Sequence, residues 1–412
     1  MKDWGRRAAL LCFIAGLLLG LWIPGIPVHA MADEPAVPLD IQARSYVLME
    51  MESGRVLADE NSDIPYEPAS LTKLMTEYVL LRKVEKGELA WDETVTISAN
   101  AASIGEAQVF LRMGEKRTVE ELFHALSIRS ANDAAVALAE HVAGSETKFV
   151  DLMNQTATEL GLTDTHFRNS TGLPMWLYRD PPRVGGKHHM SAADVAELTR
   201  RLLLDFPEIR QIISHSRYTF RNGEPREMRL RNTNEMLPGL AHYYEGVDGV
   251  KTGYTRKAGY CFAGSAERGD VRLISVVMGT VSHIQRFRET AKLLDHGFDQ
   301  IEWMDFVQKG DPIPGMAQAS VKNGVETEVA LAADGNVRYP VRKGEEDHYS
   351  WDVSLTGELE APLRAGTVVG KAKFVYDGEE VDGIEPVPVV VAEDVEAAGW
   401  FRLFFRRIAN WF

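Results

Sequence analysis

The chain has 412 residues, a length that allows two domains or three small ones. Apolar residues make up 45% and charged residues 25%, which is ordinary globular usage and excludes a wholly disordered chain. Acidic side chains outnumber basic ones 60 to 45, which argues against broad nucleic-acid binding, and the 2 cysteines exclude a disulfide scaffold.

Residues 1–32 have the layout of a secretory signal peptide. Basic residues near the start precede an apolar run over residues 8–22, and small residues follow at Ala30 and Ala32. We therefore expect export, with cleavage after Ala30 or Ala32. The alternative is an uncleaved N-terminal anchor, because the apolar run approaches membrane-spanning length if it extends to Ile26.

Residues 33–304 combine helical and strand patterns, as expected for a mixed α+β domain. Apolar residues recur at the helical period after Leu71 until Gly87 ends the pattern, and a second helical pattern closes at Gly144. The patterns predict, in chain order, a strand over 44–52, helices over 71–86 and 119–141, and a hairpin of strands over 259–266 and 271–279.

Residues 305–392 have a different texture. Short alternating runs are separated by Gly, Pro and Asp, and no long helical stripe appears before Glu393. We expect a separate small β-rich domain here. Its predicted strands are 326–331, 337–341, 350–354, 368–376 and 387–391.

Residues 393–412 predict an amphipathic helix. From Trp400 onward one helical face is rich in aromatic side chains, and the opposite face carries Arg402, Arg406 and Arg407. Such a helix suits a membrane interface, where aromatics sit at headgroup depth and cations meet anionic lipid. With so few apolar residues it should lie on the bilayer and not span it. Docking on its own domain is the alternative.

The first of three chemical motifs is Ser70-Leu-Thr-Lys73, at the start of the predicted helix 71–86. Residues i and i+3 share a helix face, so the amine of Lys73 can reach the hydroxyl of Ser70. A serine hydroxyl is a weak nucleophile until a base takes its proton, and a buried neutral lysine can be that base. Ser145 and Lys148 repeat the spacing in a polar stretch, which we interpret as solvated surface.

The second motif is Ser130-Ala-Asn132, between apolar helical patterns that favour its burial. A hydroxyl and an amide two residues apart can point into one cleft, where the hydroxyl relays a proton and the amide holds a substrate backbone group. Ser98-Ala-Asn100 repeats the pattern after a short strand-like run, where such triplets usually mark turns or caps.

The third motif is Lys251-Thr252-Gly253, at the beginning of the strand region. On an edge strand the cation attracts a substrate carboxylate, the hydroxyl donates to it, and the missing side chain lets a peptide approach the backbone. Each motif alone is weak, whereas the three in this order are specific.

The three motifs together resemble those of the low-molecular-mass penicillin-binding proteins, the serine-type D-alanyl-D-alanine carboxypeptidases. The resemblance spans nearly the whole chain and includes the segments 167–173 and 361–370. It implies an α+β fold: a penicillin-binding/β-lactamase-like catalytic domain with an antiparallel sheet and helices, a small all-β domain and a C-terminal amphipathic helix. It also implies removal of the terminal D-alanine from peptidoglycan stem peptides, inhibition by β-lactams, no metal or other cofactor, and peripheral attachment to the outer face of the cytoplasmic membrane.

The resemblance also implies a role for each motif residue. Ser70 is the residue acylated, Lys73 its general base, and Ser130 passes a proton to the leaving amine. The implied substrate-binding residues are Asn132, Lys251, Thr252, Gly253, Tyr254 and Arg286, with Arg288 a rival for the last position and the backbone N–H groups of Ser70 and Tyr254 as the oxyanion hole.

The sequence departs from the family at the segment 175–188, and two other functions are alternatives. The segment 175–188 is longer than expected and is a candidate for shaping the cleft, and its pair His188-His189 lacks further metal ligands at suitable spacing. A class A β-lactamase is one alternative, but Ser130-Ala-Asn132 replaces Ser-Asp-Asn and no Glu-x-x-Leu-Asn pattern precedes Lys251. A surface sensor that binds its ligand without turnover is the other.

Overall fold

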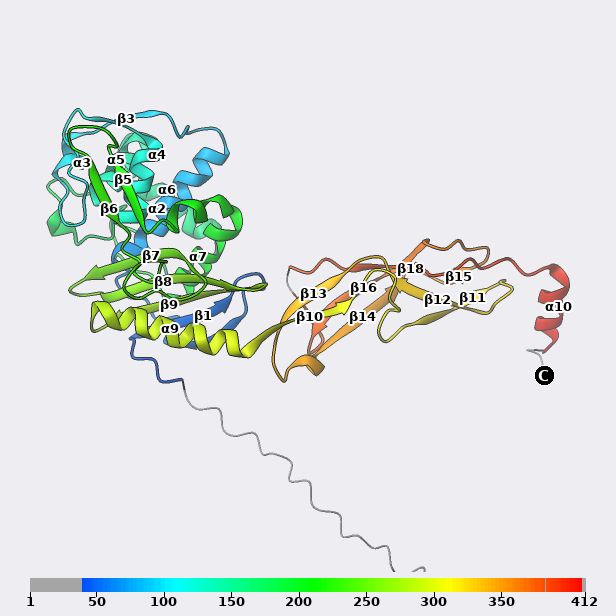
Figure 1. Cartoon of the computed structure of the whole chain (residues 1–412). Coiled ribbons are helices and arrows are strands. Elements are labelled where there is room, and N and C mark those ends of the chain that lie inside the picture. Colours follow the sequence, from blue (N-terminus) through cyan, green and yellow to red (C-terminus); the bar gives the residue numbers. More distant parts are fainter. Residues whose placement is uncertain (1–38, 382, 410–412) are drawn as a thin grey trace, which may run out of the picture. The chain divides into compact units, whose positions relative to one another are not determined.

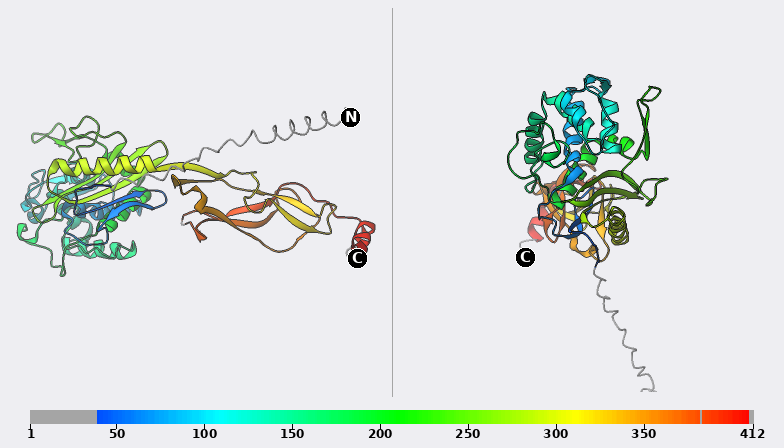
Figure 2. Two further views of the ribbon diagram at one scale, coloured as in Figure 1. Left: turned by 90° about the horizontal axis from the view of Figure 1, so that it is seen from below. Right: turned by 90° about the vertical axis from the view of Figure 1, so that its left-hand side faces the viewer.

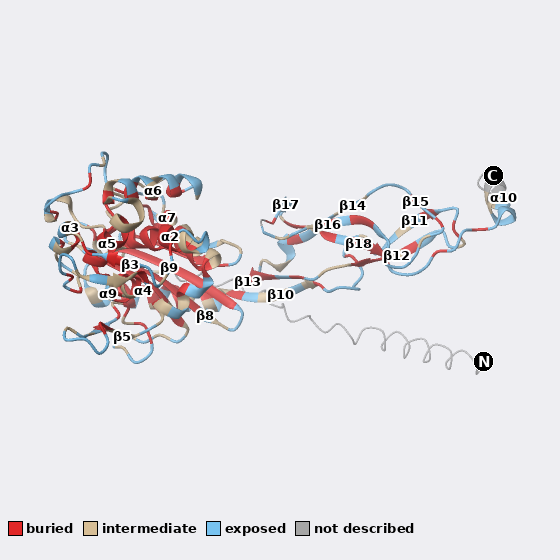
Figure 3. Cartoon of the chain, turned by 90° about the horizontal axis from the view of Figure 1, so that it is seen from above, coloured by how far each residue is buried: buried red, intermediate tan, exposed pale blue. Residues whose placement is uncertain are grey.

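The computed structural model describes residues 39–381 and 383–409, with side chains to Arg406. The predicted signal peptide lies outside the described residues. Buried apolar side chains form two separate clusters, one drawn from residues 47–278 and one from residues 307–395. Figure 3 shows the two groups of buried residues along the chain. The α+β fold with a β-rich C-terminal domain is confirmed.

The N-terminal domain is built on an antiparallel sheet of five strands in the order β2-β1-β9-β8-β7. Its strands are β1 (Ser45–Glu50), β2 (Val56–Glu60), β7 (Val247–Thr255), β8 (Gly259–Arg268) and β9 (Val271–Thr280). The predicted strand 44–52 and the hairpin of β8 and β9 are confirmed. Because β7 is an edge strand, Lys251 has a neighbouring strand on one side only.

Helices cover both faces of this sheet (Figures 1 and 2). Helix α9 (His283–Gln300) packs on β8 and β9, and α7 (Ala192–Asp205) packs on the opposite side against β1 and β9. The remaining helical elements are η1 (Ala69–Thr72), α2 (Lys73–Glu85), α3 (Ala99–Ser103), α4 (Val119–Arg129), α5 (Asn132–Ala143), α6 (Glu146–Glu159), η2 (Met175–Leu177), η3 (Pro207–Ile209) and α8 (Arg210–Ile213).

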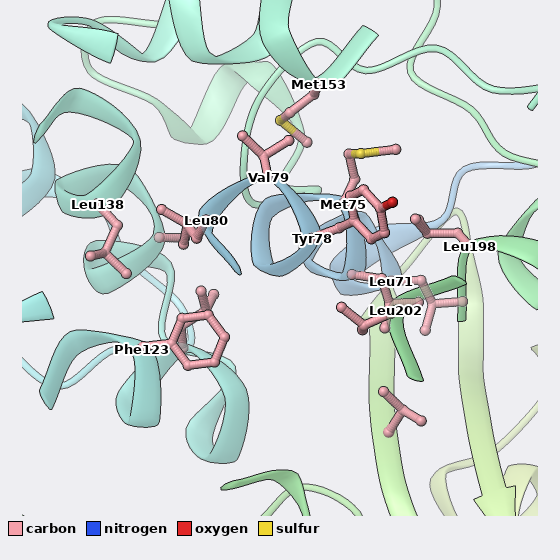
Figure 4. Packing of buried hydrophobic residues seen from close by; sticks show 14 of the residues in the cluster. Leu71, Met75, Tyr78, Val79, Leu80, Phe123, Leu138, Met153, Leu198 and Leu202 are labelled. Carbon is pink, nitrogen blue, oxygen red and sulfur yellow. The ribbon is translucent and has the colours of Figure 1, made fainter. Parts of the chain in front are cut away.

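Helix α2 lies at the centre of the helical part. Its residues from Leu74 to Leu81 are all buried, so it is enclosed on every side, as expected for a core helix. Figure 4 shows Leu80 of α2 packed close to Phe123 of α4 and Leu138 of α5. Enclosure on every side holds this helix, and the motif at its start, in one position.

The predicted helix over 119–141 is two helices. Helix α4 ends at Arg129 and α5 begins at Asn132, because Ser130 takes a left-handed backbone conformation with φ 61°. Gly144 ends α5 as predicted, with φ 77°. Two small antiparallel strand pairs flank these helices: β3 (Thr94–Thr96) with β4 (Lys116–Thr118), and β5 (Arg217–Phe220) with β6 (Met228–Arg231).

The C-terminal domain contains all five strands predicted for it. They are β12 (Glu328–Ala333), β13 (Val337–Arg342), β14 (Tyr349–Leu355), β16 (Val368–Tyr376) and β18 (Val387–Val391), joined by β10 (Ile301–Val307), β11 (Gln318–Lys322), β15 (Leu359–Glu360) and β17 (Glu379–Glu380). Because β10 pairs with β13 along its whole length, we propose that this domain begins at Ile301, slightly before the expected boundary.

The predicted C-terminal helix is present as α10 (Trp400–Ala409). Within the described residues, no helix is long and apolar enough to cross a bilayer. Trp400, Phe401, Phe404 and Phe405 are 53–67% exposed. Arg406 differs from expectation, since its guanidinium donates to the carbonyl oxygens of Gly324 and Val325 instead of facing outward.

Candidate active site

Ser70 stands on a strained turn at the entrance to α2. The residue before it, Ala69, has φ 49°, a conformation that costs an alanine about 1 kcal/mol or more. Gly172 packs so closely that a Cβ there would lie 1.8 Å from the carbonyl oxygen of Ala69. Close packing from the 169–172 segment therefore holds the turn that presents the hydroxyl.

Lys73 is fully buried, and its amine reaches the Ser70 hydroxyl. Nζ of Lys73 lies 3.0 Å from Oγ of Ser70 and 2.7 Å from both Oδ1 of Asn132 and the carbonyl oxygen of Thr171. The last two groups can only accept hydrogen bonds, so they match the two N–H donors of a neutral amine. The lone pair is then left for the proton of Ser70.

Burial also favours the neutral form of this lysine. Desolvation lowers the pKa of Lys73 well below its ordinary value, and the positive charge of Lys251 lowers it further. The carboxylates of Glu77, Asp133 and Glu146 act in the opposite direction. The net direction is the one that a general base requires at neutral pH.

The break between α4 and α5 turns Ser130 toward the third motif. Oγ of Ser130 accepts a hydrogen bond of 2.7 Å from Nζ of Lys251. Asn132, at the first turn of α5, meets Lys73 through Oδ1 and donates through Nδ2 to the carbonyl oxygen of Gly105 at 2.9 Å. The second motif thus contacts both lysines.

The edge strand β7 places the third motif beside the turn that holds Ser70. A Cβ on Gly253 would lie 2.9 Å from the carbonyl oxygen of Pro68, so only glycine lets the strand come this close to the Ser70 turn. Thr252 Oγ1 lies 2.8 Å from Thr233 Oγ1, within hydrogen-bond distance. Tyr254 is 52% exposed and stacks on Tyr260 with ring centroids 4.2 Å apart.

The structure distinguishes Arg286 from its rival Arg288. Arg286 is buried, lines the cleft, and donates to the carbonyl oxygen of Gly253 at 3.3 Å. Its Nε has no hydrogen-bond partner among the described residues. Burial lowers the pKa of Arg286 to about 10, and the side chain stays charged at neutral pH. Arg288 is exposed on another face of α9.

The predicted residues meet at one cleft of about 1530 Å³, a size that suits an extended peptide. The cleft is lined by Ser70, Ser130, Asn132, Thr252, Gly253, Tyr254 and Arg286, with Lys73 and Lys251 buried behind its wall. The long segment 175–188 also lines the cleft, and its Trp176 is 80% exposed.

Three neighbours of the motif residues carry no sequence motif of their own. They are the carbonyl of Thr171, the hydroxyl of Thr233, and the carboxylate of Glu77. Glu77 stands one helical turn after Lys73, is 0% exposed, and has no partner in normal hydrogen-bond geometry among the described residues. Burial raises its pKa to about 7, and the positive charge of Lys251 opposes that rise.

The repeated motifs lie outside the cleft and cap helices. Ser98 accepts a hydrogen bond from the backbone N–H of Ala101 at the start of α3, and Ser145 accepts one from Lys148 at the start of α6. In the described ranges, no group of three or more His, Cys, Asp or Glu side chains is placed to hold a metal ion.

Comparisons with known proteins extend over both domains. The family model described as D-alanyl-D-alanine carboxypeptidase matches residues 30–282, and that of the penicillin-binding protein 5 C-terminal domain matches residues 302–397. The chain is 33% identical to the D-alanyl-D-alanine carboxypeptidase DacF of Bacillus subtilis over 402 residues, 97% of this chain and 98% of that protein.

Solved structures agree with this similarity. Penicillin-binding protein 3 of Streptococcus pneumoniae, a peptidoglycan synthesis regulatory factor, has TM-score 0.72 and 31% identity, covering 87% of this chain and 100% of that chain. Penicillin-binding protein D2 of Listeria monocytogenes, in its ampicillin-bound form, has TM-score 0.55 and 32% identity, covering 64% of this chain and 100% of that chain.

Proposed function

The chain belongs to the D-alanyl-D-alanine carboxypeptidase family, and from this premise we propose that Ser70 is the nucleophile with which it removes the terminal D-alanine from peptidoglycan stem peptides. It is a serine-type carboxypeptidase. The observation that carries the assignment of Ser70 is the surroundings of Lys73, whose amine has two acceptors and one hydroxyl within reach.

In the first half of the reaction, Ser70 Oγ attacks the carbonyl carbon of the penultimate D-alanine and Lys73 Nζ takes the hydroxyl proton. The peptide bond breaks, Ser130 passes a proton to the leaving amine, and free D-alanine departs. A water molecule then hydrolyses the ester on Ser70 and regenerates the hydroxyl. β-Lactams acylate the same serine.

The carboxylate of the terminal D-alanine binds where three groups of β7 and α9 converge. Lys251 supplies positive charge, Thr252 donates its hydroxyl, and Arg286 offers a guanidinium whose Nε has no partner among the described residues. Asn132 holds the substrate backbone through its amide. The backbone N–H groups of Ser70 and Tyr254 serve as the oxyanion hole, supported by the close approach that Gly253 allows.

The charge of the cleft supports an anionic peptide as substrate. Although the whole chain has a formal net charge of −15, Arg and Lys outnumber Glu eight to three among the residues that line the cleft. Such a cleft attracts peptides with several carboxylates and raises their association rate. Stem peptides that keep their free carboxylates have this character.

We propose further that the protein is exported and is held on the outer face of the cytoplasmic membrane by α10. The support is the exposure of four neighbouring aromatic side chains on one face of this helix. Arg406 is engaged with the β-rich domain, so it orients the helix instead of meeting lipid. The side chains of two α10 arginines are described, Arg402 and Arg406, and of these Arg402 is exposed and can meet lipid headgroups.

The decisive experiment measures D-alanine release from a peptide ending in D-Ala-D-Ala. The wild type releases D-alanine, Ser70→Ala does not, and Ser145→Ala, which alters the repeated motif, releases it at the wild-type rate. Release by Ser70→Ala would contradict the proposed nucleophile. A wild type that is labelled by penicillin at Ser70 without releasing D-alanine would instead be a sensor.

A further inference from the structure

The catalytic turn touches a side chain from the long cleft-lining segment, here called the 173–189 loop. Nε2 of His188 in this loop lies 2.7 Å from Oγ1 of Thr72, and the Thr72 hydroxyl donates to the carbonyl oxygen of Ala69 at 2.8 Å. Ala69 immediately precedes Ser70 and has the strained φ of 49°. A chain of two hydrogen bonds therefore runs from His188 to the nucleophile's turn.

The donors and acceptors in these two hydrogen bonds follow from Nδ1, the other ring nitrogen of His188. The backbone N–H of Arg168 donates to Nδ1 of His188 at 3.0 Å, so Nδ1 is an acceptor and the ring proton is on Nε2. Nε2–H then donates to Thr72 Oγ1, which is free to accept because its own proton points to Ala69. His188 acts here as a neutral donor.

Burial keeps this imidazole neutral. It is the main reason that the pKa of His188 falls to about 3, and His166, His189 and Arg168 near the ring contribute to the fall. At neutral pH the ring of His188 is therefore neutral, with Nε2 as a hydrogen-bond donor and Nδ1 as an acceptor.

A second residue of the 173–189 loop contacts Thr171, the residue whose carbonyl orients Lys73. The hydroxyl of Tyr178 lies 2.6 Å from Thr171 Oγ1 and donates to Glu146 Oε1 at 3.1 Å. The carbonyl of the same Thr171 accepts from Lys73. Glu146 also accepts from the backbone N–H and the hydroxyl of Ser170, which fixes this segment to the start of α6, and Thr76 of α2 donates to the Ser170 carbonyl oxygen.

We propose that the 173–189 loop is a positioning element for the Ser70–Lys73 pair, with His188 and Tyr178 as its positioning residues. His188 steadies the turn that carries Ser70, and Tyr178 steadies the carbonyl that orients Lys73. The inference rests on the proposed roles of Ser70 and Lys73 and adds that cleft wall and catalytic pair form one hydrogen-bonded unit. A small displacement of either residue slows acylation, because the reacting atoms must be held within fractions of an ångström.

Two amide variants separate the two hydrogen bonds of His188. In His188→Gln the side-chain amide reaches as far as Nε2 and can still donate to Thr72, whereas in His188→Asn only the acceptor near Arg168 is kept. We expect Asn and Ala to lower kcat and the rate of acylation by a fluorescent penicillin about tenfold to a hundredfold, with KM nearly unchanged. Gln should recover most of the lost rate, and Tyr178→Phe should slow acylation at constant ring packing.

The control is His348→Gln, because Nδ1 of His348 lies 2.8 Å from Oδ1 of Asp377 in the β-rich domain and not beside the catalytic turn. Thermal unfolding of every variant reports folding, and if the Ala variant does not fold, the Gln and Asn pair decides. Equal rates for Gln and Asn, or wild-type rates for all His188 variants, would overturn the role of His188. A wild-type rate for Tyr178→Phe would overturn the role of Tyr178. Ser70→Ala, assayed in parallel, reports separately on the proposed function.

Discussion

Nζ of Lys251 lies 2.7 Å from Oγ of Ser130 and joins the edge strand β7 to the turn between α4 and α5. Both side chains are buried, and Lys251 has no carboxylate partner among its described hydrogen bonds. The ammonium group therefore orients the serine hydroxyl and polarises it. This pair explains how two motifs that are 121 residues apart in the sequence act together.

Replacement of Ser130 by alanine is the first prediction. Without the hydroxyl the leaving amine lacks its proton donor, so we expect kcat for D-alanine release to fall by roughly 10²- to 10⁴-fold. The protein should still fold and bind peptide. Rapid-quench measurement of D-alanine release gives the rate.

Ser98→Ala is the matched control, because Ser98 belongs to the repeated Ser-Ala-Asn motif but caps α3. It should lower the free energy of unfolding by about 1 kcal/mol and leave the rate of D-alanine release unchanged. A loss of activity in Ser98→Ala equal to that in Ser130→Ala would contradict the assignment of the second motif.

The fold of this region was only partly predictable. The apolar stripe runs through residues 119–141 without Gly or Pro, so local pattern favours one continuous helix. Tertiary contacts break it. Lys251 holds the Ser130 side chain, and the backbone N–H of Asn132 donates to the carbonyl oxygen of Ala107 at 2.7 Å. No local signal reveals contacts between segments so far apart.

The candidate site was likewise only partly predictable from the sequence. Residues within motifs, such as Ser70 and Lys251, were predictable because their chemistry requires particular side chains at short spacing. Thr171, by contrast, contributes its backbone carbonyl. Every residue has this group, so the amino-acid sequence does not mark the position. In the sequence His188 stands out only as half of a histidine pair, and its contact with Thr72 depends on the path of a long loop.

The second prediction concerns pH. Burial lowers the pKa of Lys251 to about 8, with Arg286 adding to the fall and Glu77 opposing it. Only the protonated form attracts the substrate carboxylate, so kcat/KM should be high below this pKa and fall as the pH rises through about 8. Lys251→Arg, which stays charged, should lack this fall even if its overall rate is lower. The same alkaline fall in the arginine variant would exclude Lys251 as its cause.

The third prediction concerns Glu77. Its carboxylate raises the pKa of Lys251, so Glu77→Gln should move the alkaline fall of kcat/KM to lower pH. Glu85→Gln, an exposed change on the same helix, should leave the profile unchanged. The measurement is kcat/KM between pH 6 and about 9 for the three proteins. An unshifted profile in Glu77→Gln would mean that this carboxylate is neutral or ineffective.

The fourth prediction is slow breakdown of the β-lactam acyl-enzyme. Class A β-lactamases use a glutamate near the acylated serine to activate water. Among the described residues, the groups bonded to Ser70 and Lys73 include no carboxylate. Protein labelled with benzylpenicillin should therefore remain labelled, by intact-mass spectrometry, long after excess antibiotic is removed. Rapid loss of the label would instead favour a β-lactamase.

The last prediction concerns membrane attachment by α10. Phe404 and Phe405 are 53% and 65% exposed, and moving such side chains into lipid stabilises binding by on the order of 1 kcal/mol each. Replacing both by serine should weaken sedimentation of the processed protein with phosphatidylethanolamine–phosphatidylglycerol vesicles about tenfold or more. D-alanine release from a soluble peptide should be unaffected, because the catalytic cleft does not include this helix.

The control is Val368→Ser, which removes an apolar side chain, 57% exposed, from the β-rich domain and should leave vesicle binding unchanged. Equal vesicle binding by the phenylalanine variant and the wild type would show that these two side chains contribute nothing to attachment, and the exposed aromatic face of α10 would need another partner.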